Sequence, residues 1–134
     1  MYYSSVPFAL RVLDESLAIA RLPADSDVPA WAVTGLHSIT RTPTELSIVC
    51  PDRDVPAGAT EERGWRALAV EGVLDISDVG VLSEIAGPLA AANVPIFVLS
   101  TYETDYVLVP AELLAKSTEA LERAGHSVAV AEGG

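Results

Sequence analysis

The order of apolar runs and helical patterns between Trp65 and Val130 constrains the fold of this chain more than any other feature. Short runs rich in β-branched and aromatic residues predict strands, and longer stretches with apolar residues three and four positions apart predict helices. The expected elements are, in order, a strand at 66–70 that can be extended through 73–76, a helix at 80–92, strands at 96–99 and 107–109, a helix at 111–124 and a strand at 126–130. This βαββαβ order is that of the split βαβ, or ferredoxin-like, motif, and it predicts an α+β fold.

The first expected helix contains a stop signal and an internal proline. Asn93 followed by Pro95 is a stop signal, because asparagine tolerates the left-handed conformation and proline cannot continue a helix. Pro88 lies inside the helix and removes the hydrogen bond to the carbonyl of Glu84, so we expect a kink or a late break there. The residues whose spacing predicts a core-facing side of this helix are Leu82, Ile85, Leu89 and Ala92.

The first half of the chain contains only strand signals. The expected strands are 8–13, 17–22, 32–40 and 45–50. The first two would be joined by the polar turn 14–16, and the last two by a threonine-rich turn. The run 51–64 is rich in proline, glycine and charge, which predicts a mobile surface connection. We therefore expect a mostly β module over 1–60 and a βαββαβ module over 61–134.

Composition excludes several classes of function. The 134 residues carry a net charge of −11 with only 8 lysines and arginines, so nucleic acid and anionic membranes are poor partners. No apolar run approaches the roughly 20 residues that span a bilayer, and the N-terminus lacks the basic region of a secretory signal. A single cysteine, Cys50, excludes an internal disulfide. We expect a cytoplasmic protein without metal or cofactor.

The sequence offers no catalytic constellation. His37 and His126 could each act as an acid or base, but neither has a serine, cysteine or carboxylate at a telling spacing. Cys50 ends an apolar strand and is expected to be buried and inert. These patterns favour a protein that is not an enzyme.

A polar segment, Ser100–Tyr106, separates the two central apolar strands of the second half. Its hydroxyls and carboxylate lie at the joint of two core strands, where side-chain geometry can be held for recognition. The alternative is a hairpin whose threonines and aspartate only satisfy their own turn backbone.

Three segments, 39–50, 64–72 and 100–109, resemble those of small bacterial ACT-domain proteins, which are similar to the tandem ACT modules of aspartate kinases and of the CASTOR arginine sensors. The resemblance implies tandem ferredoxin-like modules, the N-terminal one degenerate. It also implies a regulatory protein, expected as a homodimer, that binds an amino acid at a module interface and reports to a partner that the sequence does not identify.

The resemblance further implies where the ligand lies. The expected ligand-binding residues are Asp78, Val79, Gly80, Val81, Leu82, Ser100, Thr101, Tyr102, Thr104 and Asp105. In the arginine sensors the equivalent turn places its carboxylate toward the ligand's cationic group, so arginine or another amino acid is expected. The loop into the first helix would form the other wall, because free N–H groups at a helix start attract a carboxylate. The alternative is a structural or interaction dimer, or a small enzyme, with no amino-acid ligand.

Overall fold

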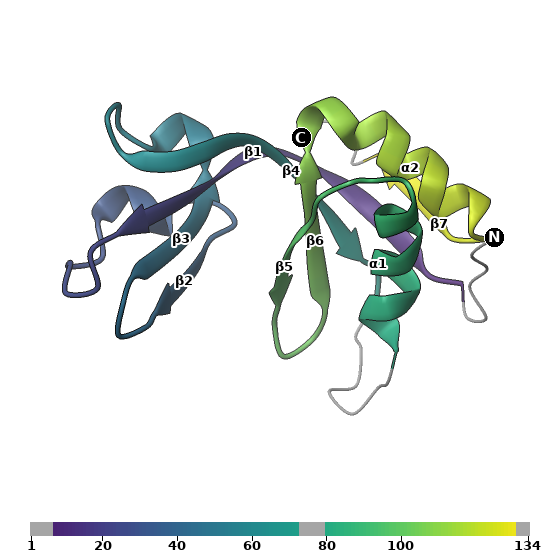
Figure 1. Cartoon of the computed structure of the whole chain (residues 1–134), viewed down its shortest axis with the longest axis horizontal. Helices are drawn as coiled ribbons and strands as arrows, with labels where there is room; N and C mark the ends of the chain where they lie inside the picture. The colour runs from purple at the N-terminus through teal and green to yellow at the C-terminus, as the bar shows by residue number, and fades with distance from the viewer. Residues whose placement is uncertain (1–6, 73–79, 131–134) are drawn as a thin grey trace. The chain divides into compact units, whose positions relative to one another are not determined.

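The computed structural model describes residues 7–72 and 80–130 of the chain and divides it into two compact units. The large unit comprises Met1–Asp14 and Arg66–Gly134, and the inserted unit comprises Glu15–Trp65. Two strands, β1 (Ala9–Leu22) and β4 (Thr60–Val70), carry residues of both units (Figure 1). This division differs from the predicted boundary at residue 60, because the start of β1 belongs to the large unit.

The large unit contains two helices and three further strands. They are α1 (Val81–Ala91), β5 (Phe97–Ser100), β6 (Asp105–Pro110), a short 3-10 helix at Ala111–Leu113, α2 (Leu114–Arg123) and β7 (Ser127–Val130). From β4 to β7 the elements follow the predicted order of strand, helix, strand, strand, helix, strand. The suggested extension of the first strand through 73–76 lies outside the described residues.

The sheet of the large unit gains a strand that the βαββαβ pattern does not include. The start of β1 pairs in parallel with β7, with Ala9 opposite Ser127. On its other side β1 neighbours β4, which is followed by β6 and β5. β6 and β5 pair antiparallel, with Leu108 opposite Phe97. Residues near the N-terminus therefore complete a sheet whose other strands come from the second half of the chain.

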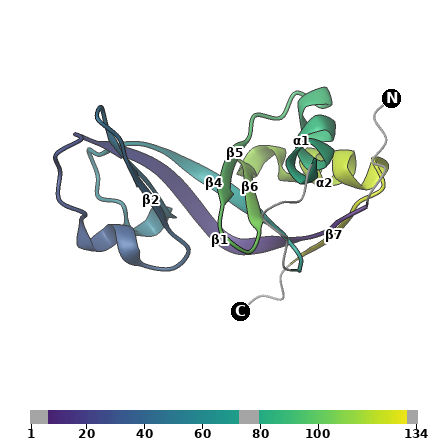
Figure 2. The ribbon, with the colours of Figure 1, turned by 90° about the horizontal axis from the view of Figure 1, so that it is seen from below.

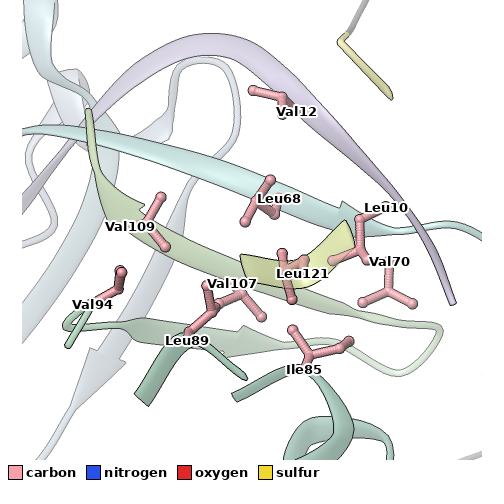
Figure 3. Close-up of a cluster of buried hydrophobic side chains, with 10 residues drawn as sticks. All are labelled: Leu10, Val12, Leu68, Val70, Ile85, Leu89, Val94, Val107, Val109 and Leu121. Atoms are coloured by element: carbon pink, nitrogen blue, oxygen red, sulfur yellow. The ribbon is translucent and has the colours of Figure 1, made fainter. Parts of the chain in front are cut away.

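The core of the large unit lies between this sheet and the two helices. Alternate residues of a strand share one face, and on β1, β4 and β6 one such set is buried against Ile85 and Leu89 of α1 and Leu121 of α2 (Figure 3). The strand residues of this cluster are Leu10, Val12, Leu68, Val70, Val107 and Val109. Figure 2 shows both helices together on one side of the strands. Each fully buried side chain of this size contributes about 1.5–3 kcal/mol through the hydrophobic effect.

The inserted unit consists of a hairpin, two 3-10 helices and its shares of β1 and β4. Its own elements are a 3-10 helix at Ala30–Val33, β2 (Ser38–Arg41), β3 (Leu46–Pro51) and a 3-10 helix at Asp52–Asp54. β3 pairs antiparallel with both β2 and β1. Its core consists of Ala18, Ala20, Ala32, Leu46, Ile48, Cys50 and Val55. The predicted strand 32–40 begins only at Ser38, because a 3-10 helix and Gly35, with a φ of +55°, precede it.

The turn predicted at 14–16 does not exist, and β1 runs unbroken through it. The polar residues there have partners elsewhere in the chain. The hydroxyl of Ser16 donates to Oδ2 of Asp52 at 2.6 Å, and Glu15 forms an ion pair with Arg53. Because these side chains are satisfied by distant residues, the backbone has no need to turn.

The run 51–64, predicted to be a mobile surface connection, contains secondary structure. It holds the 3-10 helix at Asp52–Asp54 and the beginning of β4. The guanidinium of Arg63 donates to the carbonyl oxygens of Asp52 at 2.6 Å and Val55 at 2.9 Å and pairs with Glu61. The charged side chain of Arg63, which suggested a solvated loop, therefore joins several residues of this segment by hydrogen bonds.

Candidate ligand-binding site

The candidate site begins at the last residue pair of the β5–β6 ladder. Ser100 lies opposite Asp105, and its hydroxyl donates to Oδ1 of that carboxylate at 2.7 Å. The antiparallel ladder sets both residues on the side of the sheet that carries Val107, which is the side of the helices. Asp105 is partly exposed, so a carboxylate held in one orientation faces outward at the end of the hairpin.

The turn between the two strands contains hydrogen bonds among its own residues. The N–H of Thr101 donates to the carbonyl of Thr104 at 2.8 Å. The Thr101 hydroxyl donates to that carbonyl at 3.1 Å and accepts from the N–H of Thr104 at 3.2 Å. Tyr102 lies at the tip with 81% of its surface exposed. For Thr101 the geometry matches the alternative in which the turn caps itself.

Thr104 ties the hairpin to a neighbouring strand. Its hydroxyl donates to the carbonyl oxygen of Val70, the last residue of β4, at 2.9 Å. The sequence analysis did not include Val70 in the site. A carbonyl carries no side-chain signal, so only the pairing of β4 with β6 brings it to the turn.

The second expected wall is the start of α1. Gly80 precedes the helix with a φ of +86°, and its carbonyl accepts from the N–H of Glu84 and the hydroxyl of Ser83, both at 3.0 Å. Gly80 occupies the N-cap position and has no side chain with which to cap the helix. A Cβ on Gly80 would meet no atom closer than 3.8 Å, so the surroundings are open and the glycine is required by its backbone conformation.

The two helical residues of this wall point in different directions. Val81 packs against the core of the large unit, whereas Leu82 is 39% exposed. The prediction that Leu82 faces the core is therefore wrong, because Ile85 and Leu89 define a face that Val81 shares instead. Asp78 and Val79 lie outside the described residues.

The structure forms two hydrogen-bonded pairs at the end of this hairpin, Ser100 with Asp105 and Thr101 with Thr104. The turn and the start of α1 lie at the same end of the large unit (Figure 1). Within the described part of the chain, no hydrogen bond joins the turn to Gly80, Val81 or Leu82.

His37 and Cys50, the other candidates for acid, base or nucleophile, do not belong to this site. Nδ1 of His37, which is exposed, lies 3.1 Å from the carbonyl oxygen of Gly35. Cys50 is fully buried in the core of the inserted unit, and burial, with the nearby carboxylates of Asp54 and Asp52, raises the pKa of its thiol. Burial therefore keeps this thiol protonated and unreactive, as expected.

Over residues 7–72 and 80–130, no group of three or more histidine, cysteine or acidic side chains is arranged to hold a metal ion. None of the helices in these ranges has the length and apolar content that a bilayer crossing requires.

Two family models match the chain. One, described as the ACT domain, matches residues 60–123, and the other, described as an N-terminal domain, matches residues 15–58. The two matches meet close to the start of β4, and the chain leaves the inserted unit within the same strand, after Trp65.

Curated relatives match part of this chain. The human protein named cytosolic arginine sensor for mTORC1 subunit 1 is 37% identical over 60 residues, which is 44% of this chain and 18% of the relative. The match thus spans about a fifth of the relative's length.

Solved structures extend the likeness to nearly the whole chain. An Agrobacterium tumefaciens protein is 35% identical with a TM-score of 0.90, and the match covers 96% of this chain and 97% of that one. The regulatory subunit of aspartate kinase from Thermus thermophilus shares the fold, with a TM-score of 0.54 at 14% identity over 85% of this chain and 97% of that one. The family model, the fold and the relatives agree that residues 60–123 of this chain form an ACT domain.

Proposed function

We propose that this chain is a regulatory protein without catalytic activity that binds an amino acid at the β5–β6 turn, with arginine as the first candidate. The carboxylate of Asp105 carries the proposal. It is held by Ser100 at the end of the hairpin, is partly exposed, and lies at the same end of the large unit as the start of α1. A carboxylate and a helix start together offer partners for both ends of a cationic amino acid.

Two further observations support arginine. The chain carries a net charge of −11, which attracts cations to its surface. A relative 37% identical over 60 residues is by its name a cytosolic arginine sensor, and we place this chain in the cytoplasm on the same ground.

The binding group assigned to this site is Ser100, Thr104, Asp105 and the backbone of Asp78 to Leu82. Thr101 shapes the turn, and Tyr102, exposed at its tip, contacts the ligand or the surface that covers it. We propose that the inserted unit is a second, reduced ACT-like module and that a homodimer completes the pocket at a module interface.

Thermal unfolding with each of the twenty amino acids tests the proposal. A ligand that binds only the folded state raises its melting temperature, so arginine should give a selective rise. If none of the twenty raises the melting temperature, the chain is the alternative, a structural or interaction domain without an amino-acid ligand.

Calorimetry then tests the residue. Asp105→Asn should weaken arginine binding by about 2 kcal/mol or more, because the guanidinium would lose its charged partner. Glu103→Gln is the matched control, since Glu103 is an exposed carboxylate of the same turn. Equal losses in the two variants would show that overall charge, rather than Asp105, attracts the ligand.

A further inference from the structure

Helix α1 contains a carbonyl that the helix itself cannot satisfy. In an α-helix each carbonyl accepts from the N–H four residues later, and for Glu84 that residue is Pro88, which has no N–H. The helix nevertheless continues to Ala91. Gly87 permits this, because it has no Cβ to clash with the proline ring.

His126, at the far end of the chain, offers this carbonyl a donor from outside the helix. Its Nε2 lies 2.9 Å from the carbonyl oxygen of Glu84, and its Nδ1 lies 2.9 Å from the backbone nitrogen of Phe8. The N–H of Phe8 can only donate, so Nδ1 must be the acceptor. Nε2 then carries the ring proton and donates it to Glu84. His126 is 4% exposed, so water has little access to replace either bond.

The same histidine is fixed on its other sides. Its ring stacks on that of Phe8 with centroids 5.8 Å apart. Its backbone N–H donates to Leu121 of α2, and the N–H of Ser127 donates to the carbonyl of Phe8, both at 3.0 Å. His126 therefore connects α1 to the residues that begin β1 and β7.

We propose that Pro88 and His126 form a clamp: the proline frees the Glu84 carbonyl, and the imidazole uses it to fix the first turns of α1. The N–H of Glu84 donates to the carbonyl of Gly80, so the clamp holds the residue from which the helix starts. Under the proposed function, on which this last step rests, His126 is a positioning residue for the helix wall of the ligand site.

A double-mutant cycle tests the clamp without any ligand. His126→Asn keeps an acceptor near the N–H of Phe8 but cannot reach Glu84, so it should lower the folding equilibrium constant about tenfold or more. Pro88→Ala restores a helical N–H to the Glu84 carbonyl. In that background the same substitution should cost about threefold or less, since the carbonyl keeps a donor.

Urea unfolding of the four proteins measures the cycle, and His37→Asn, an exposed histidine, is the matched control that should show no dependence on Pro88. Equal penalties with and without Pro88→Ala would overturn the clamp. If His126→Asn does not fold, nitrogen-15 NMR of the wild-type ring decides instead. The clamp requires a protonated Nε2 and a bare Nδ1, and the opposite tautomer overturns it.

Calorimetry with L-arginine tests the positioning role. His126→Asn should weaken arginine binding several-fold, and adding Pro88→Ala should restore the affinity to within about twofold of that of Pro88→Ala alone. A coupled unfolding cycle with unchanged arginine affinity in His126→Asn would keep the clamp and remove its role at the site. If the wild type binds no arginine, the proposed function fails, while the unfolding cycle still decides the clamp.

Discussion

The two units each contain a hairpin whose turn is rich in threonine, and the two turns are built alike. In the β2–β3 turn the N–H of Thr42 donates to the carbonyl of Glu45, and in the β5–β6 turn the N–H of Thr101 donates to that of Thr104, both at 2.8 Å. In both, the hydroxyl of the first threonine accepts a backbone N–H, that of Thr44 or Thr104, at 3.2 Å. These hydroxyls therefore stabilise turns whatever the hairpin is used for.

The hairpins differ in the pair that closes each ladder. Arg41 and Leu46 close the first, and Ser100 and Asp105 close the second. Leu46 is fully buried in the core of the inserted unit, whereas Asp105 is partly exposed. The residue just after the turn, and not the turn itself, thus decides whether the end of a hairpin belongs to a core or is open to a ligand.

Exchanging the residues at the two closing positions should give the largest effect. Leu46→Asp places an unpaired carboxylate in a sealed core, and we expect it to lower the free energy of unfolding by about 4 kcal/mol or more. The reciprocal Asp105→Leu changes a partly exposed position and should cost within about 1 kcal/mol. Urea unfolding followed by circular dichroism measures both. Similar losses would mean that the two hairpin ends are equivalent, and the comparison would fail.

A smaller effect is expected from the bond that only the second turn makes. Thr104→Val removes the hydroxyl donor of the Val70 carbonyl and should lower the free energy of unfolding by about 1 kcal/mol. Thr44→Val is the matched control, because the hydroxyl of Thr44 meets only that of Thr42, at 3.3 Å on the surface. Its cost should stay within about 0.5 kcal/mol. A larger loss in the control than in Thr104→Val would contradict the assignment.

The smallest effect is the pH dependence of stability that arises from Cys50, which lies in the same core as Leu46. Because the folded protein raises the pKa of the Cys50 thiol, the folded state holds its proton at pH values where the unfolded chain has lost it. The stability from this group is complete below the ordinary thiol pKa of about 8.5 and declines as the pH rises above it. Urea unfolding from pH 7 to 10 should show the decline, and Cys50→Ala should reduce it. Rapid labelling of Cys50 by a thiol reagent in the native protein would contradict its burial.

Local patterns were sufficient to predict the elements of the second half. The segment from β4 to β7 follows the predicted order, and Asn93 follows the end of α1 with a φ of +61°, as the stop signal indicates. Both helices lie within three residues of their expected limits.

The errors arose where distant residues decide the structure. The chain does not turn at Ser16, because the hydroxyl of Ser16 donates to Asp52, 36 positions later. The charges of 51–64 did not mark a loop, because Arg63 bonds to two carbonyls of the same segment. His126 was considered only as an acid or base, since its partners, Phe8 and Glu84, are far from it in sequence.

For the candidate site, residue types predict the polar turn but not which of its side chains bond within the turn and which remain exposed. The hydroxyl of Thr101 bonds to the backbone of its own turn, whereas the carboxylate of Asp105 accepts from Ser100 and stays partly exposed. Residue types alone do not predict this difference. Leu82 fitted the helical spacing, yet the buried face of α1 is narrower than the apolar pattern.

The parallel pairing of β1 with β7 sets an order of events during synthesis. The inserted unit is contiguous in sequence, so its core can form while the rest of the chain is still on the ribosome. The start of β1 must wait, because its partner Ser127 follows Ala9 by 118 positions. Contacts of such sequence separation form slowly, and until they do, Leu10 and Val12 lack the helices that bury them. The large unit is therefore the last part of the chain to fold and the part most exposed to aggregation while it is being made.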